Sequence, residues 1–249
     1  MMGNVTSLWR HPIKSHGREA VTSTTLIAGH TMPGDRVWAV AHETSKADGA
    51  EWVSCGNFSR VSKAPELMAM TAALDEPAGM VTLTHPKLGD FTFDPDGDAS
   101  GFLDWVRPIM PADRAQSARL IKVPNRGMTD SDFPSVTICN MASHRAVEQT
   151  IGFEMSIHRW RGNIWLDGDD LLPWDEFDWM DRNIRIGDAI LRPRERTDRC
   201  AATTTNPETG LRDADTLSVL DRFGHRDFSV RAEVINGGNI EIGSKAELI

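Results

Sequence analysis

The sequence predicts an α+β protein in which strands predominate. Short runs of β-branched and apolar residues, bounded by Pro, Gly and polar residues, outnumber the helical patterns. Most connections between these runs are too short for the crossover that two parallel strands need. We therefore expect a mostly antiparallel, barrel-like sheet with a few helices. The length of 249 residues allows one large domain or two small ones.

Strands and one helix are expected in the first half of the chain. The strands are Val5–Trp9, Val37–Ala41, Met80–Thr84 and Asp90–Phe93. The last two are separated by HPKLG, which favours a hairpin. A helix is expected after Ser100, with Phe102, Leu103 and Val106 on one face, until Pro108 disrupts it.

The second half follows a polar, irregular segment at 111–131, the best candidate boundary. Its expected strands are Ser135–Cys139, Ile164–Asp167, Ile184–Ile186 and Ala189–Arg192. One helix is expected from the N-cap Asn140 to about Gln149, with Gly152 after it, and another at Thr216–Arg222, with Asp215 as cap and Gly224 as stop. FSVRAEVI, the turn NGGN and IEIG predict a closing hairpin.

The composition excludes several classes of protein. A net charge of −9 argues against non-specific nucleic-acid binding, which needs a dominant basic surface. Cys55, Cys139 and Cys200 form neither a disulfide framework nor a zinc-binding CxxC pattern. The N-terminus lacks the apolar region of a signal peptide, and no run approaches the roughly 20 apolar residues of a membrane span. We expect a cytoplasmic protein that binds neither membrane nor nucleic acid.

The run LRPRERTDRC is the strongest chemical signal in the chain. Arg192, Arg194, Arg196 and Arg199 precede Cys200 in an otherwise acidic protein. Nearby guanidinium groups favour a thiolate, which can act as a nucleophile or bind a soft metal. The same arginines could hold a phosphate or another anion. The alternative is a buried structural cysteine beside a solvated basic strand.

Three other segments carry donors for a ligand. Lys14 and Ser15 in HPIKSHG could donate to phosphate or carbonyl oxygens, or simply form a surface turn. Arg36 in MPGDRVWAV follows a turn and could donate to a ligand, face solvent or form an Arg–Asp pair. In HRWRGNIWLDG, Arg159, Arg161 and Asn163 are spaced by two, so an extended segment would turn all three to one face. That face suits an anionic or heterocyclic ligand, or is the charged outer face of an edge strand.

The remaining cysteines carry weaker signals. Cys139 ends an apolar strand and is expected to be buried and inert. Cys55, in SCGNFSR, is expected to be a loop thiol without clustered arginines. No histidine pattern typical of a metal site and no Gly-rich nucleotide-binding motif is present.

Taken in order, these segments resemble the MOSC-domain family. HPIKSHG, MPGDRVWAV and FSRVSKAPELMAM resemble the N-terminal β-barrel region of that family. The later segments resemble the MOSC domain itself, and its RCxxTTxxPxTG signature appears as RCAATTTNPETG, beginning at Arg199. The resemblance implies a MOSC fold with a β-barrel core, an N-terminal MOSC β-barrel region at 1–115 and a MOSC domain at 125–249. It is greatest for the branch of the mitochondrial amidoxime-reducing component and its bacterial relatives.

The resemblance implies the molybdenum cofactor, Mo-molybdopterin. Cys200 would ligate the metal, while the pterin and its phosphate would be held by residues that match Lys14, Ser15, Arg36, Thr137, Arg161, Asn163 and Arg199. Pyridoxal phosphate is not expected. One departure from the family pattern is Gly162, which stands where Pro is usual.

The implied activity is that of an oxidoreductase that reduces N-hydroxylated compounds: amidoximes, hydroxylamines and N-hydroxy bases. Because clustered cysteines for an iron–sulfur domain are absent, electrons would come from a separate donor protein, such as a ferredoxin, a flavoprotein or a cytochrome b5-like protein. The alternative function is a sulfur carrier or transferase that holds a persulfide on Cys200 for the maturation of a metal–sulfur cofactor.

Overall fold

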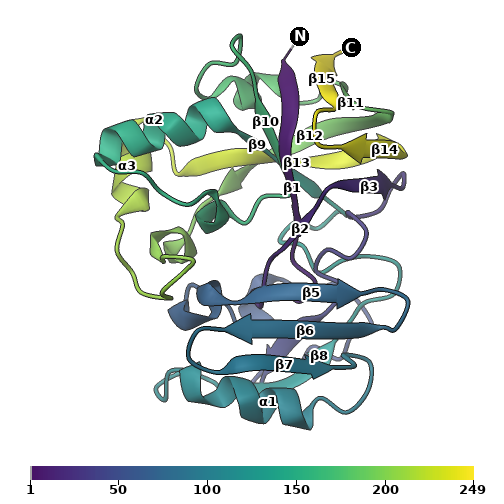
Figure 1. Cartoon of the computed structure of the whole chain (residues 1–249), viewed down its shortest axis with the longest axis vertical. Helices are drawn as coiled ribbons and strands as arrows, with labels where there is room; N and C mark the ends of the chain where they lie inside the picture. Colours follow the sequence, from purple (N-terminus) through teal and green to yellow (C-terminus); the bar gives the residue numbers. More distant parts are fainter. Residues whose placement is uncertain (1) are drawn as a thin grey trace.

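A closed barrel of seven strands forms one half of the molecule (Figure 1). In the computed structural model, which describes residues 2–249, the strands follow the order β10–β9–β13–β12–β11–β15–β1, and β1 pairs back with β10. They are β1 (Gly3–Arg10), β9 (Val136–Asn140), β10 (Ile164–Asp167), β11 (Ile184–Ile186), β12 (Ala189–Asp198), β13 (Asp227–Asn236) and β15 (Lys245–Leu248). Closure leaves each of these strands paired with a barrel strand on both sides, so the barrel has no free edge.

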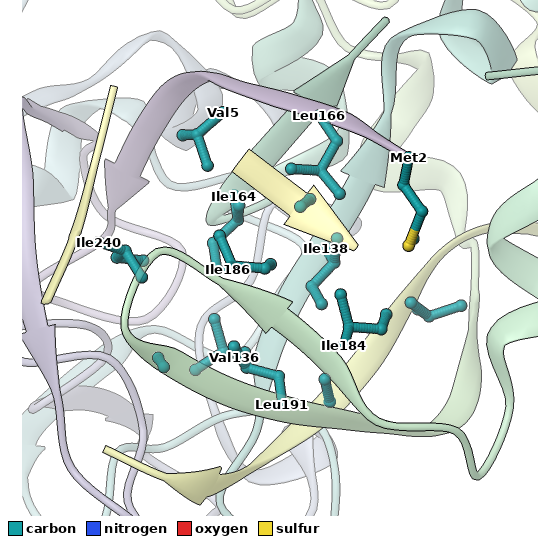
Figure 2. Packing of buried hydrophobic residues seen from close by; sticks show 14 of the residues in the cluster. Met2, Val5, Val136, Ile138, Ile164, Leu166, Ile184, Ile186, Leu191 and Ile240 are labelled. Carbon is teal, nitrogen blue, oxygen red and sulfur yellow. The ribbon is translucent and has the colours of Figure 1, made fainter. Parts of the chain in front are cut away.

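Alternating apolar residues fill the barrel (Figure 2). Val5, Ile138, Ile164, Ile186 and Leu191 are at most 1% exposed. All neighbouring strands are antiparallel except β9 and β10, which helix α2 (Met141–Ile151) connects. The prediction of a mostly antiparallel, barrel-like sheet with few helices is therefore confirmed.

The other half of the molecule is built on two smaller sheets (Figure 1). Strands β5 (Thr71–Asp75), β6 (Met80–His85) and β7 (Gly89–Phe93) form an antiparallel sheet, and β4 (Ala39–His42) pairs with β8 (Ser117–Ile121). Helix α1 (Ser100–Val106) packs Phe102 and Val106 into the core of this half. The predicted β6–β7 hairpin and the helix after Ser100 are both confirmed.

Both helices of the barrel half have the predicted caps, and α2 runs to Ile151, two residues beyond the expected end near Gln149. The Asn140 side chain accepts a hydrogen bond from the Ala142 amide, and Gly152 adopts φ 93° after the last turn of α2. Helix α3 (Thr216–Arg222) is capped by Asp215, whose side chain accepts from the Ser218 amide. None of the helices within residues 2–249 has the length and apolar character needed to cross a membrane.

The predicted C-terminal hairpin is wrong. Both edges of β13 are already occupied, by β12 and by β9. The chain after the NGGN turn therefore forms β14 (Gly238–Glu241) on a different partner, β3 (Ser23–Leu26). Strand β8 also lies inside the segment 111–131, which we expected to be irregular.

The two sequence regions are interleaved in space. Strand β1 belongs to the barrel and β2 (Glu19–Val21) extends from it, although both precede β4 and the smaller sheets. The connecting 3₁₀ turns are η1 (Cys55–Asn57), η2 (Pro65–Ala69), η3 (Arg107–Ile109), η4 (Ile157–Trp160), η5 (Asp175–Trp179) and η6 (Ala201–Thr204).

Candidate functional site

A cavity of about 340 Å³ brings together segments that are distant in the sequence. Its walls include Lys14 after β1, Cys55 in η1, Asp130 before β9, Arg161 after η4 and Cys200 after β12. The volume lies within the range of small-molecule sites. A more open hollow of about 550 Å³ lies near Asp167, whose carboxylate forms an ion pair with Arg145, and no cysteine lines it. The smaller cavity is therefore the candidate site.

Nearly all of the predicted site residues line this cavity. They are Lys14, Ser15, Arg36, Thr137, Arg161, Arg199 and Cys200. Asn163 does not line it. Its side-chain Oδ1 accepts from the Thr137 amide at 3.0 Å and its Nδ2 donates to the Trp9 carbonyl at 3.0 Å. Asn163 thus joins β1 to β9 and positions Thr137.

The expectation that Arg159, Arg161 and Asn163 share one face of an extended segment is wrong. Arg159 lies in the 3₁₀ turn η4, and Arg161 adopts a left-handed backbone conformation with φ 51°. These backbone angles turn the three side chains to different partners. Arg159 pairs with Asp213, Asn163 binds backbone groups, and Arg161 reaches the cavity.

Three of the seven non-glycine residues with positive φ in the described chain line the cavity. Ser15, Arg36 and Arg161 have φ values of 66°, 51° and 51°. Residues with a Cβ rarely adopt this region, and such strain persists where the surrounding structure holds a functional side chain in place. The Arg36 side chain also donates to the Arg161 carbonyl at 2.9 Å, so two of these residues brace each other.

Lys14 is buried and paired with the carboxylate of Asp130 at the cavity wall. Its ammonium donates to the Met128 carbonyl at 2.6 Å and to Asp130. Burial would raise the pKa of Asp130, but the Lys14 charge and hydrogen bond lower it to about 2. Burial lowers the pKa of Lys14, and Asp130 opposes that shift. The Asp130 carboxylate is therefore ionised at neutral pH.

Arg36 is anchored from behind by a buried carboxylate. Asp35 forms an ion pair with Arg36 and also accepts a hydrogen bond from the His11 backbone amide at 2.7 Å. Burial opposes ionisation of Asp35, but Arg36 and His11 hold its pKa well below the usual range. A charged Asp35 fixes the turn that aims Arg36.

Among residues 2–249, no carboxylate forms an ion pair with Arg161 or Arg199. Burial, reinforced by the charge of Arg36, lowers the pKa of Arg161 to about 9. Burial also lowers the pKa of Arg199 to about 10, and its guanidinium donates to the carbonyls of Phe228 at 3.0 Å and Trp160 at 2.9 Å. A bound anion would relieve this desolvated positive charge.

The other arginines before Cys200 do not converge on its thiol. Arg192 donates to Asn183 at 2.9 Å, Arg194 pairs with Asp181 at 3.0 Å, and the Arg196 guanidinium lies 4.2 Å from the Phe177 ring centre. Strand β12 has register irregularities between Pro193 and Glu195 and between Arg196 and Asp198, so a spacing of two residues does not bring these side chains to the thiol. The cations of the cavity come mostly from distant segments instead.

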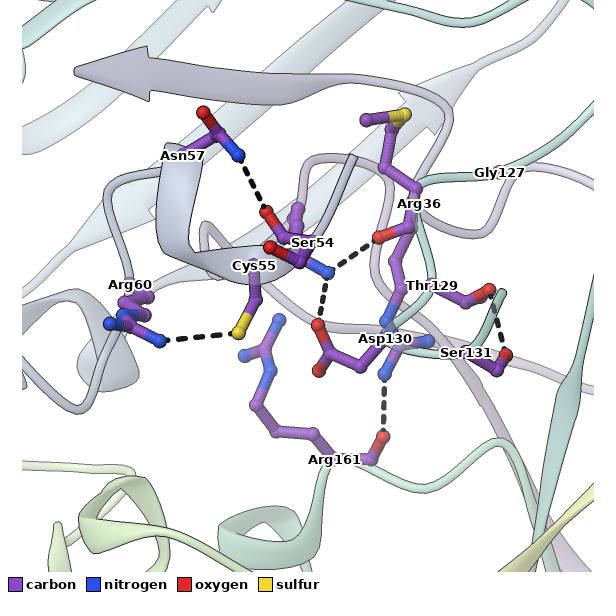
Figure 3. A network of polar contacts seen from close by, with 12 residues as sticks. Arg36, Ser54, Cys55, Asn57, Arg60, Gly127, Thr129, Asp130, Ser131 and Arg161 are labelled. Carbon is purple, nitrogen blue, oxygen red and sulfur yellow. Dashed lines mark hydrogen bonds and ion pairs between the residues drawn. The ribbon is translucent and has the colours of Figure 1, made fainter. Parts of the chain in front are cut away.

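The three cysteines have different environments. Cys200 is exposed, whereas Cys139 is fully buried, and burial raises the pKa of Cys139 to about 12. The expectation of an inert Cys139 agrees with this environment. Cys55, in contrast, lines the cavity, and Arg60 donates to its sulfur at 3.1 Å (Figure 3). Sequence reasoning missed this placement because no local pattern links the segment of Cys55 to that of Cys200.

Arg159 is a second residue that the predicted set omitted. It lines the cavity, is 3% exposed, and donates from Nη2 to Asp213 at 2.6 Å. Its Nε and Nη1 are buried without a hydrogen-bond partner in the described chain. A buried, unsatisfied guanidinium nitrogen is costly, so these donors favour a polar ligand or water beside them.

Two of the solved structures that this chain resembles are remote likenesses. The YuaD protein from Bacillus subtilis is 12% identical over 100% of this chain and 96% of its own, with a TM-score of 0.47. YiiM from Geobacillus stearothermophilus is 15% identical over 46% of this chain and 53% of its own, with a TM-score of 0.34. No curated protein matches the sequence.

The family comparison covers most of the chain. The family described as MOSC N-terminal beta barrel domain matches residues 2–102. The family described as MOSC domain matches residues 127–247, which include Cys200 and the barrel strands from β9 to β15. The chain is therefore a member of the MOSC-domain family.

Proposed function

We propose that the cavity binds the molybdenum cofactor, with Cys200 as the protein ligand of the metal, and that the protein reduces N-hydroxylated compounds. The observation that carries this proposal is the position of an exposed thiol in a cavity rich in desolvated cations. A thiolate is a suitable ligand for a soft metal, and guanidinium and ammonium groups suit a phosphate. Membership of the MOSC family, which is named after the molybdenum cofactor sulfurase, supports this choice.

The residues present fit the cofactor in charge and donor type. The positively charged Arg161 and Arg199 have no carboxylate partner among the ion pairs of residues 2–249, and Arg159 has two buried nitrogens without acceptors. An anionic phosphate and a pterin ring rich in acceptors would satisfy such groups. Lys14, Ser15, Arg36, Thr137 and Arg161 would hold the cofactor, and Arg199 would support the wall from which Cys200 projects.

The protein's own contribution is binding and orientation. When bound, the cofactor would supply the two-electron redox chemistry that these side chains cannot perform. The overall reaction consumes two electrons and two protons per N-hydroxy group and yields the N–H compound and water. The left-handed residues Ser15, Arg36 and Arg161 would keep the binding groups fixed, which reduces the cost of ordering them when the ligand binds. Electrons would come from a separate donor protein.

The test is the molybdenum content per chain, by elemental mass spectrometry, after expression in a host that makes the cofactor. We expect near-stoichiometric metal in the wild type and a large loss in Cys200→Ala. Cys139→Ala is the matched control, because Cys139 is buried outside the cavity lining, and it should retain the metal. Loaded wild type should then reduce an amidoxime with an artificial electron donor.

A metal-free but folded wild type would contradict this proposal. An exposed Cys200 would also suit a persulfide carrier. In that case, mass spectrometry after incubation with a cysteine desulfurase should show one added sulfur on Cys200, and none in Cys200→Ala. Metal bound equally by wild type and Cys200→Ala would refute the ligand role of the thiol.

A further inference from the structure

The cavity is lined by one arginine, Arg60, that has no carboxylate partner within residues 2–249 and was not among the predicted cofactor-binding residues. The cationic side chains lining the cavity are Lys14, Arg36, Arg60, Arg159, Arg161, Arg199 and Arg231. Carboxylates pair with four of them: Asp130 with Lys14, Asp35 with Arg36, Asp213 with Arg159, and both Glu195 and Asp198 with Arg231. Within residues 2–249, this leaves Arg60, Arg161 and Arg199.

These three arginines differ in how their donors are used. The Arg199 guanidinium donates to backbone carbonyls of Phe228 and Trp160 and to the Ser229 hydroxyl. Burial and the charge of Arg36 lower the pKa of Arg161 to about 9, and its Nη2 donates to the Gly17 carbonyl at 3.4 Å. Arg60 has a single side-chain hydrogen bond within the described chain, from Nη1 to the Cys55 sulfur at 3.1 Å. Since a guanidinium carries five N–H donors, most of those of Arg60 remain available.

The backbone holds Arg60 firmly at the wall. Its carbonyl accepts from the amides of Lys63 and Ala64, both at 2.9 Å, which closes a turn. On either side, Ser59 and Val61 are buried, and Val61 belongs to the core beneath β6 and α1. Arg60 is therefore presented to the cavity from a rigid support, which limits the entropy lost when it binds a ligand.

The wall that carries Arg60 is fastened to the loop that carries Cys200. Arg212, in the loop after Cys200, donates to the Ser62 carbonyl at 2.8 Å and to the Ala201 carbonyl at 3.3 Å. Gly210 approaches the same wall so closely that a Cβ would lie 2.7 Å from the Glu66 Cα. The spacing between Arg60 and the thiol is thus set by direct contacts across the cavity.

We infer that Arg60 is a specificity-determining residue that binds a carboxylate on the substrate, so that the preferred substrates are anionic N-hydroxylated compounds. This inference rests on the proposed function, because it assumes that the N-hydroxy group reacts beside Cys200. Arg60 would bind the carboxylate through a charge-assisted fork of N–H donors. A phosphate on the cofactor is the other possible source of the same chemistry, and the experiment separates the two.

The test compares para-carboxybenzamidoxime with neutral benzamidoxime in wild type, Arg60→Gln and the exposed control Arg114→Gln. Loss of a charge-assisted hydrogen bond should raise the ratio of the KM for the anionic substrate to that for the neutral one about 10- to 100-fold in Arg60→Gln. Arg114→Gln should keep the wild-type ratio, since Arg114 does not line the cavity. An unchanged ratio in Arg60→Gln overturns the inference.

Two further measurements separate the possible failures. If molybdenum per chain falls in Arg60→Gln as it does in Cys200→Ala, Arg60 serves the cofactor and the inference is wrong. If wild type reduces neither substrate, the proposed function fails. A binding measurement then tests separately whether Arg60 recognises a carboxylate. Calorimetric titration of the same molybdenum-loaded protein with para-carboxybenzamide and benzamide should then show tighter binding of the carboxylate, lost in Arg60→Gln. Equal affinity of the wild type for both amides would also refute the inference that Arg60 binds a carboxylate.

Discussion

Substitutions at Gly162 and Cys139 are expected to have coupled effects on the free energy of unfolding. A Cβ added at Gly162 would lie 2.2 Å from the Cys139 sulfur, whereas ordinary contacts lie at 3.4–4 Å. The sulfur or the chain would have to move by more than 1 Å (3.4 − 2.2 = 1.2) in a place where Cys139 has no exposed surface. Overpacking of this kind costs about 1–3 kcal/mol. Gly162→Ala should therefore lower the melting temperature by several degrees, at about 2–4 °C per kcal/mol.

The assay is a double-mutant cycle measured by urea unfolding. Cys139→Ala removes the clashing sulfur and leaves its Cβ 3.6 Å from the new methyl group, which is an ordinary contact. Alone, it should cost about 1 kcal/mol for the small cavity it creates. In the Cys139→Ala background, Gly162→Ala should then be nearly neutral, which gives a coupling free energy of about 1–3 kcal/mol.

The same pair bears on the site, because Gly162 follows the cavity residue Arg161 directly. Gly162→Ala should reduce the molybdenum content along with stability, and Cys139→Ala in the same chain should restore both. Additive unfolding free energies, with the same cost of Gly162→Ala in both backgrounds, would refute the reasoning. Such additivity would mean that the sulfur is not what keeps position 162 free of a side chain.

Two other predictions follow from burial. In the folded protein, a disulfide reagent should label Cys200 and Cys55, whereas Cys139, whose pKa burial raises to about 12, should react only after unfolding. Equal labelling rates for all three thiols would contradict this order. Burial lowers the pKa of His16 from 6.5 to about 4 and that of His11 well below its usual value, so both remain neutral while the unfolded chain takes up protons. Stability should be complete above about pH 6.5 and fall as the pH decreases toward about 4, by about 1.4 kcal/mol per pH unit for each histidine. Urea unfolding between those pH values checks this, and a flat profile would show that the two rings are not buried as neutral groups.

Local sequence patterns determined the helices, many of the strands and the chemical type of the site, but not β2, β3, β5, β8 or β15. The caps Asn140 and Asp215, the alternating strands and the hairpin of β6 and β7 were predictable because each depends on neighbouring residues. The run from Arg199 to Gly210 likewise indicated a motif thiol without any knowledge of the fold. Pairings between distant strands were not predictable in this way, so the chain after β13 joined β3 instead of forming a hairpin.

The convergence of charge at the cavity was decided by the tertiary structure alone. The arginines that precede Cys200 alternate along β12 and mostly face away, whereas Arg36, Arg60 and Arg161 arrive from segments far along the chain. The same holds for the position of Cys55 at the cavity and for the close approach of the Cys139 sulfur to Gly162. A sequence pattern reports spacing along one element, but the electrostatic field of a cavity depends on distances between elements. Those distances are set by how the barrel closes and how the smaller sheets pack against it.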